Sequence, residues 1–169
     1  MSKILPIITM GHPTLEMRAQ EVLNIQKSSV QKLIDTMIET MYTKDGIGLA
    51  APQVNQSYRI AVLCPEPAKY ENYRTQEKKN ALVIINPVIK KHSLLKSDSE
   101  EGCLSVPNII GIVKRYKSLS VSYFDRDGAP QQIDAKGLLA QCLEHEIDHL
   151  DGILFIKKAH KLFRLVKNM

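Results

Sequence analysis

Apolar side chains recur at helical spacing in two long parts of the chain. The first stripe follows Ser28 and Ser29, either of which can act as an N-cap, and it consists of Val30, Leu33, Ile34, Met37, Ile38 and Met41. The second stripe consists of Leu138, Leu139, Cys142, Leu143 and Leu150. These patterns predict an amphipathic helix of about four turns in the first third of the chain and a second helix that Asp151 and Gly152 end.

A third, shorter stripe lies at the C-terminus. Ile156, Ala159, Phe163 and Val166 fall on one side of a helical projection, and basic residues fall largely on the other. We therefore expect a short basic amphipathic helix over residues 157–169.

Five apolar runs rich in β-branched residues predict strands. They cover residues 58–63, 81–89, 109–113, 118–123 and 130–135. Asp125-Arg126-Asp127-Gly128 predicts a hairpin turn between the last two runs. Residues 65–79 are polar and contain two prolines, so they are expected to form an exposed loop or a hairpin tip.

The composition is that of one globular domain. The 169 residues are 44% apolar and 24% charged, and no linker divides them, so we expect residues 1–169 to form a single catalytic domain. No apolar run approaches the length of a membrane span, and residues 4–8 are too short and Pro-broken for a signal-peptide core. These features predict a cytoplasmic protein with no membrane partner.

The net charge of +5 is a property of the C-terminal segment. Residues 1–156 carry equal numbers of basic and acidic side chains, whereas the last part of the chain carries Lys157, Lys158, Lys161, Arg164 and Lys167 with no acid. This segment is either a solvated helix face or an element that binds the ribosome or RNA. The rest of the chain gives no indication of a specific nucleic acid.

The second predicted helix carries His145-Glu146-Ile147-Asp148-His149. Spacing of i, i+4 puts both histidines on one helix face, where two imidazoles can bind one metal ion. Glu146 can then lie near that ion without binding it, as the general base of a metal-dependent hydrolase does. The alternative is a charged, solvated helix face.

Residues 46–53, Gly-Ile-Gly-Leu-Ala-Ala-Pro-Gln, hold two glycines and two alanines. The third glycine of a dinucleotide-binding loop and a preceding strand are both missing, so nucleotide binding is rejected. The small residues leave room for another backbone, and the amide of Gln53 can donate to an oxyanion. A tight turn with a surface glutamine remains the alternative.

Cys103 follows an acid and a glycine and could be a nucleophile or a metal ligand. Metal ligation is the better interpretation, because no separate histidine remains as a general base once His145 and His149 are paired. The three cysteines of the chain, odd in number and without tight spacing, do not suggest a disulfide framework. Three protein ligands that leave a fourth position to water are typical of a catalytic metal site.

Together, residues 46–53, 101–105 and 145–152 resemble the three motifs of the peptide deformylase family, in the family's order. The resemblance extends over nearly the whole chain. It implies an α+β fold in which small mixed or antiparallel sheets surround a central metal-binding helix. It also implies removal of the N-formyl group from the N-terminal formylmethionine of newly synthesised polypeptides, with release of formate. The family's metal is usually Fe(II), with Zn(II) often found in preparations and Ni(II) as a further candidate.

Carried over position by position, the resemblance assigns a role to each motif residue. Cys103, His145 and His149 would be the metal ligands, and Glu146 would be the acid and base. The side-chain amide of Gln53 and the backbone N–H of Leu104 would stabilise the oxyanion. The residues that would bind substrate are Ile47, Gly48, Gly102, Leu138 and Cys142.

Three positions depart from the family's pattern. Glu144 stands where the family usually has Gln, Gln141 where an apolar pocket residue is common, and Ile110 where many members have Arg. We expect the methionine pocket and the affinity for peptide to differ accordingly. A separate expectation is an ion pair between Arg115 and Asp148 behind the metal helix.

Two other functions are weighed against this one. The first is a zincin-type endopeptidase that shares only His-Glu-x-x-His, which the motifs around Cys103 and Gln53 argue against. The second is a ribosome-binding protein without activity, in which the metal only stabilises the fold.

Overall fold

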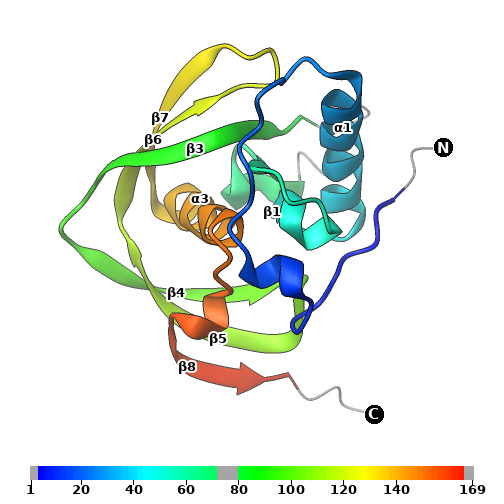
Figure 1. Cartoon of the computed structure of the whole chain (residues 1–169). Coiled ribbons are helices and arrows are strands. Elements are labelled where there is room, and N and C mark those ends of the chain that lie inside the picture. Colours follow the sequence, from blue (N-terminus) through cyan, green and yellow to red (C-terminus); the bar gives the residue numbers. More distant parts are fainter. Residues whose placement is uncertain (1–3, 72–79, 166–169) are drawn as a thin grey trace.

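A central helix between two antiparallel sheets organises the computed structural model, which describes residues 4–71 and 80–165 (Figure 1). The helices are α1 (Ser28–Thr43) and α3 (Gly137–Leu150). The strands are β1 (Gly48–Ala50), β2 (Ile60–Leu63), β3 (Leu82–His92), β4 (Lys96–Cys103), β5 (Val106–Tyr116), β6 (Ser118–Phe124), β7 (Pro130–Lys136) and β8 (Ala159–Arg164). Short 3₁₀ turns are η1 (Pro13–Glu16), η2 (Ala51–Val54), η3 (Pro67–Lys69) and η4 (Phe155–Lys157).

The strands form two separate sheets. The larger has the order β1-β2-β3-β6-β7, and the smaller has the order β4-β5-β8. All the strand pairs within these sheets are antiparallel. A parallel arrangement occurs only as one isolated bridge between Gln20 and Tyr58 within the described residues. The α+β class is therefore confirmed, in its antiparallel form.

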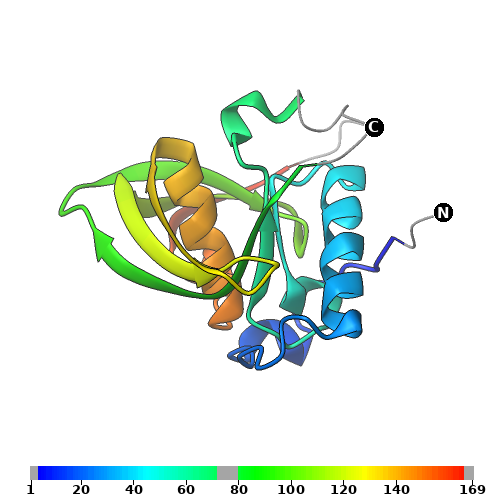
Figure 2. The same ribbon diagram turned by 90° about the horizontal axis from the view of Figure 1, so that it is seen from above.

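The larger sheet is covered on both faces, which follows from the alternation of its side chains. Val62 and Ile85 pack with α1 on one face, whereas Ala61 and Ile84 pack with α3 on the other. Seen from above, α1 and α3 lie on opposite sides of this sheet (Figure 2). The predicted stripe of α1 is confirmed, since Val30, Ile34, Met37 and Met41 are buried.

Helix α3 also faces the smaller sheet. A third apolar cluster contains Val106 and Val113 of β5 together with Leu154 and Phe155, which follow α3. The helix that carries the histidine motif thus lies between the two sheets (Figure 1). Its position is set by packing on several sides, which suits a helix that must hold ligands in fixed geometry.

Most of the expected local structure is confirmed. The five predicted strands correspond to β2, β3, β5, β6 and β7, and the backbone N–H of Gly128 donates to the carbonyl of Asp125 in the predicted hairpin turn. The predicted cap of α1 is wrong, because the helix begins at Ser28 and its cap residue is Lys27, which makes no side-chain cap hydrogen bond. Strand β4 was not among the predicted strands. In the predicted loop 65–79, η3 forms a 3₁₀ turn, and residues 72–79 lie outside the described residues.

The predicted C-terminal helix over residues 157–169 is wrong in its described part. Phe155–Lys157 is a 3₁₀ turn and Ala159–Arg164 is strand β8, which pairs with β5 from Ile109↔Arg164 to Val113↔Ala159. A short terminal helix gains little on its own, whereas a strand at this place satisfies the backbone groups along the edge of β5. Residues 166–169 lie outside the described residues.

No helix in the described part of the chain combines the length and the apolar character that crossing a membrane requires.

The end of α3 gives a stability prediction. Gly152 has φ +76°, and a Cβ built there would lie 2.7 Å from the carbonyl carbon of Glu16. We expect Gly152→Ala to lower the free energy of unfolding by roughly 2–4 kcal/mol, from the left-handed conformation and the collision with backbone. The measurement is urea denaturation of wild type and variant. Gly11→Ala is the control, because Gly11 also has positive φ but a Cβ there would meet nothing within 4 Å. Equal losses in the two variants would contradict the collision.

Candidate active site

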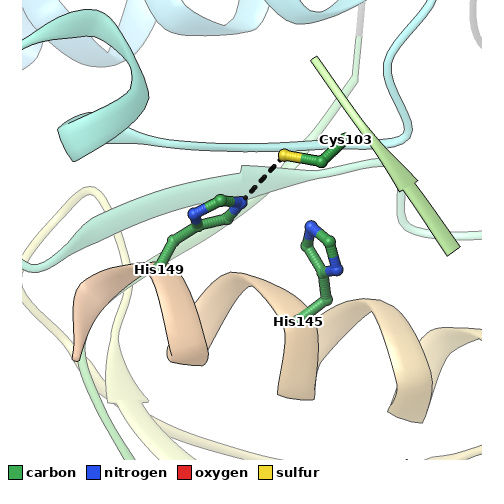
Figure 3. A group of neighbouring side chains, drawn as sticks. All are labelled: Cys103, His145 and His149. Atoms are coloured by element: carbon green, nitrogen blue, oxygen red, sulfur yellow. Dashed lines mark hydrogen bonds between the residues drawn. The ribbon is translucent and has the colours of Figure 1, made fainter. Parts of the chain in front are cut away.

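Helix α3 and the end of β4 bring Cys103, His145 and His149 together. One potential ligand atom from each of the three side chains lies within 4.8 Å of the others (Figure 3). The Sγ atom of Cys103 is 3.3 Å from Nε2 of His149. The three candidate ligands from two distant motifs thus form one cluster, and the solvated-face alternative is wrong for His149, which is 1% exposed.

The cluster fits a tetrahedrally bound divalent ion. A thiolate and an imidazole on one such ion are about 3.6 Å apart, close to the spacing of Cys103 and His149. His145 uses Nδ1 to contact Oε2 of Glu101 at 2.8 Å, which leaves Nε2 for a metal. Nδ1 of His149 is buried and has no partner within the described residues. The three donors would therefore hold the ion and leave its fourth position open.

Glu146 lies beside this cluster, with 4% of its surface exposed. Its Oε2 atom is buried without a hydrogen-bond partner in the part of the chain that the structure describes. Burial raises the pKa of Glu146 to about 7, against the opposing effect of His145. A Cβ on Gly48 would collide with this carboxylate, so glycine at position 48 makes room for it. The result is a carboxyl group that is free to exchange a proton near neutral pH.

Gln53 is not the surface glutamine of the alternative interpretation, because it is 2% exposed. Its Oε1 accepts a hydrogen bond from the backbone N–H of Ala50 at 2.9 Å. This bond turns Nε2 toward Ser105 Oγ, at 3.2 Å, and Cys103 Sγ, at 3.4 Å. The amide N–H groups of Gln53 therefore face the cluster of candidate metal ligands.

A cavity of about 500 Å³ opens at the cluster. Ten of the eleven predicted site residues line it, and His149 is the exception. The ten are Ile47, Gly48, Gln53, Gly102, Cys103, Leu104, Leu138, Cys142, His145 and Glu146. Three separate sequence motifs thus share one cavity, as the resemblance implied.

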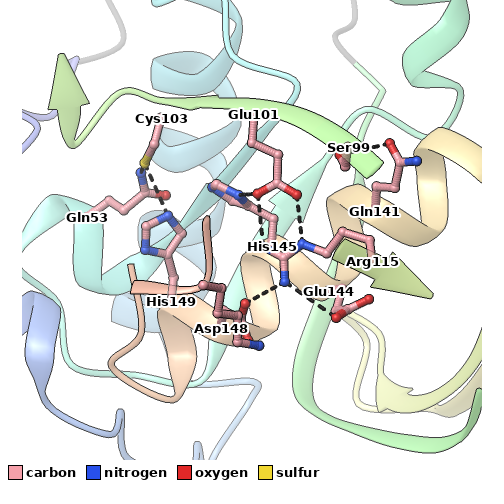
Figure 4. A network of polar contacts seen from close by, with 11 residues as sticks. Gln53, Ser99, Glu101, Cys103, Arg115, Gln141, Glu144, His145, Asp148 and His149 are labelled. Carbon is pink, nitrogen blue, oxygen red and sulfur yellow. Dashed lines mark hydrogen bonds and ion pairs between the residues drawn. The ribbon is translucent and has the colours of Figure 1, made fainter. Parts of the chain in front are cut away.

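Behind the cluster, Arg115 is fully buried and is surrounded by carboxylates (Figure 4). Its Nε and Nη2 donate to the two oxygens of Glu101 at 2.7 and 2.9 Å, and its Nη1 donates to Asp148 at 2.6 Å. Glu144 accepts from Nη1 at 3.4 Å and from the backbone N–H of Tyr116 at 3.1 Å. The predicted pair of Arg115 and Asp148 is confirmed, and it belongs to a larger network.

These contacts control the charge of the network and its neighbours. Burial raises the pKa of Glu101, but hydrogen bonds from Arg115 and His145 outweigh this effect and lower it to about 2. Burial lowers the pKa of His145, but hydrogen bonds with Cys103 and Glu101 outweigh this effect and raise it to about 10. Burial lowers the pKa of His149. The Glu101 carboxylate therefore stays charged beside His145.

The three departures occupy different places. Glu144 faces Arg115 and Tyr116 and does not line the cavity. Gln141 does line it, and its Oε1 accepts a hydrogen bond from Ser99 Oγ at 3.1 Å. Ile110 lies on the cavity wall. Of the three departures from the family's pattern, only those at positions 110 and 141 can therefore alter the shape of the cavity directly.

The sequence interpretation missed Glu101, although a signal was present. Glu101 and Cys103 are two residues apart, and alternate residues of a strand share a face. A predicted strand over the residues of β4 would therefore have placed the Glu101 carboxylate on the same side as Cys103, the candidate metal ligand. Ser105 lies within the motif over residues 101–105 but was given no role, and its Oγ accepts a hydrogen bond from Gln53 Nε2 at 3.2 Å. Asn108, Ile109 and Leu165 were missed without such a signal, because they reach the site only through the pairing of β4, β5 and β8.

The sequence model of the polypeptide deformylase family matches residues 4–164. The chain belongs to this family. A peptide deformylase of Pelotomaculum thermopropionicum is 44% identical over 160 residues, which are 95% of this chain and 94% of that protein. Peptide deformylase 2 of a Nostoc species is 41% identical, over 92% of this chain and 86% of its own. The fold agrees with a Met-Ala-Ser-bound deformylase structure from Acinetobacter baumannii at TM-score 0.82 and 35% identity, over 94% of this chain and 99% of that one.

Membership of this family establishes the reaction. Deformylases are metal-dependent hydrolases that remove the N-formyl group from nascent peptides, and neither the endopeptidase nor the inactive alternative is favoured.

The network behind His145 gives a prediction about metal affinity. We expect Glu101→Gln to weaken metal binding about 10- to 100-fold, because the charged partner that orients His145 is lost. Competition with a chromogenic chelator measures this affinity. Glu144→Gln is the matched control: it removes a carboxylate from the same arginine but has no contact with His145. Equal affinities in wild type and Glu101→Gln would contradict the orienting role.

Proposed function

We propose that this deformylase works through Glu146 as acid and base, with Cys103, His145 and His149 as the metal ligands. The observation that carries the proposal is the buried, unpartnered carboxylate of Glu146 beside the three ligands. Every other buried carboxylate around Arg115 is committed to an ion pair, so it is not free to move a proton.

The cavity accounts for recognition of the first residue. Its α3 wall offers Leu138 and Cys142, and Ile47 comes from the segment that leads into β1. An unbranched methionine side chain fits such an apolar pocket, and Gln141 adds one polar group. Gly48 and Gly102 would contact the formyl group and the peptide backbone.

Cys103, His145 and His149 would hold a divalent ion, which would supply Lewis acidity and make water a stronger nucleophile at neutral pH. Glu146 takes a proton from the attacking water, and the new C–O bond forms at the formyl carbon. The Gln53 amide and the Leu104 backbone N–H donate to the oxyanion, and each such donor typically lowers the barrier by about 3 to 4 kcal/mol. Glu146 then gives the proton to the leaving amine as the C–N bond breaks, which yields formate and a free N-terminus.

We further propose that Fe(II) is the native ion and that Zn(II) and Ni(II) can replace it. One thiolate and two imidazoles accept all three metals, so the donor set supports each of them. A cytoplasmic location is part of the same proposal, since the substrate is a nascent peptide.

The basic C-terminal segment as a ribosome contact stays a prediction. Lys157 lies 3.5 Å from Glu16 and Lys158 lies 2.7 Å from Asp148, so both have partners within the chain. Lys161 and Arg164 are exposed on β8 and support the prediction.

The test of the acid–base role is formate release from formyl-Met-Ala-Ser, a peptide chosen because the Acinetobacter relative holds Met-Ala-Ser. We expect Glu146→Ala to lower turnover by more than about 100-fold while metal stays near one ion per chain. The protein is purified without oxygen, and its metal is identified and quantified. Substantial activity in the fully metallated variant would overturn the mechanism, and internal cleavage of unformylated peptides would favour an endopeptidase.

The ribosome prediction is tested by co-sedimentation. We expect wild type to sediment with ribosomes at low salt and to be released as salt rises, because basic contacts to phosphate exchange with counterions. The double variant Lys161→Glu, Arg164→Glu, which changes the two exposed basic residues of β8, should bind less at every salt concentration. Lys117→Glu is the control, since Lys117 is exposed but lies outside the C-terminal segment. Equal binding by all three proteins would remove the prediction.

A further inference from the structure

A second cavity, of about 550 Å³, adjoins the first around the ends of β5 and β8. Val106, Asn108, Ile109 and Leu165 line both cavities, so the two are neighbours that share a wall. The second cavity adds Thr9 and Met10 from the N-terminal segment, Pro107 from β5 and Arg164 from β8.

The walls of this second cavity are held by backbone hydrogen bonds. The N–H of Met10 donates to the carbonyl of Ser105 at 2.8 Å, and the N–H of Leu165 donates to the carbonyl of Asn108 at 2.9 Å. The N-terminal segment and the end of β8 are thus both fixed to the start of β5. Figure 1 shows β8 beside β5, at the edge of the smaller sheet.

The lining of the second cavity has a simple chemistry. Arg164 is its only charged side chain and forms no ion pair within the described residues. Met10 and Leu165 are 49% and 53% exposed and flank the cavity with apolar surface. An occupant with a carboxylate and an aliphatic stem would match both features.

The direction of the substrate connects the two cavities. In the first cavity, Leu138, Gln141 and Cys142 of α3 form one wall, and Asn108, Ile110 and Leu165 form another. With the methionine side chain against α3, the rest of the peptide has to leave along the walls that α3 does not supply. Of these walls, the one that includes Asn108 and Leu165 also lines the second cavity.

We propose that the second cavity binds the residues of the nascent chain that follow the first three, and that Arg164 selects an acidic side chain there. The proposal rests on the proposed function, because the first cavity must hold the formylated end. An extended peptide advances about 3.3 Å per residue, so a scan of positions four to six covers about 10 Å of chain beyond the first three residues.

The test uses six-residue peptides that begin with formyl-Met-Ala-Ser and carry Glu or Lys at position four, five or six, with Ala elsewhere. At low salt, we expect the kcat/KM of wild type to be about two- to fivefold higher for the Glu peptide than for the Lys peptide at one of these positions. The difference should arise from a lower KM for the Glu peptide. Arg164→Glu should reverse this preference. Lys117→Glu removes an exposed lysine that lines neither cavity and should keep the wild-type preference.

Two results would overturn the proposal. One is an equal kcat/KM for Glu and Lys peptides at every position, and the other is the same change in Lys117→Glu as in Arg164→Glu, which would mean a diffuse effect of net charge. Failure of metal-loaded wild type to hydrolyse formyl-Met-Ala-Ser would instead refute the proposed function. In that case the anisotropy of fluorescein-labelled, unformylated hexapeptides still decides whether Arg164 distinguishes Glu from Lys.

Discussion

The ion network around Arg115 is the interaction on which the arrangement of this deformylase depends. A guanidinium that is fully removed from water is very costly unless its donors meet acceptors, and here three carboxylates surround it. They come from β4, as Glu101, and from α3, as Glu144 and Asp148. A shift of α3 that moved Glu144 and Asp148 away would leave the buried charge of Arg115 with one carboxylate partner in place of three. The network therefore fixes the register of α3 against the smaller sheet.

The geometry of the proposed metal ligands follows from this constraint. Glu101 contacts both Arg115 and Nδ1 of His145, so the strand, the arginine and the ligand form one chain of contacts. Apolar burial alone defines the rotation of a helix less narrowly, because the hydrophobic effect has no preferred direction, whereas a hydrogen bond weakens steeply when its angle changes. The apolar face of α3 packs on the larger sheet and contributes hydrophobic stabilisation. The polar face of α3 makes hydrogen bonds with Arg115 of the smaller sheet, and these set the orientation of the helix about its axis.

The part of the site that lies within one helix can be predicted from the sequence, because the spacing of His145 and His149 follows from helix geometry. The pairing of Arg115 on β5 with Asp148 on α3 is a longer-range prediction, and it is confirmed. What could not be predicted depends on strand pairing. The segment after Phe155 has a helical pattern and nevertheless forms β8, because its environment is the edge of β5 and not water. The same pairing places Leu165 at the cavity wall, which no pattern in the segment itself indicates.

Two buried polar atoms beside Cys103 break the general rule that buried polar groups are hydrogen-bonded. Arg115 shows that this fold can satisfy even a deeply buried charge, yet Glu146 Oε2 and His149 Nδ1 are buried without partners in the described part of the chain. Both atoms belong to residues of one helix turn beside Cys103. An unsatisfied carboxylate destabilises the folded state, and a hydrogen-bonding neighbour would relieve the cost but would also remove its capacity to exchange a proton. The ion pairs of Arg115 with Glu101, Glu144 and Asp148 stabilise the folded state around α3 and offset the cost of the unpaired Glu146 carboxylate.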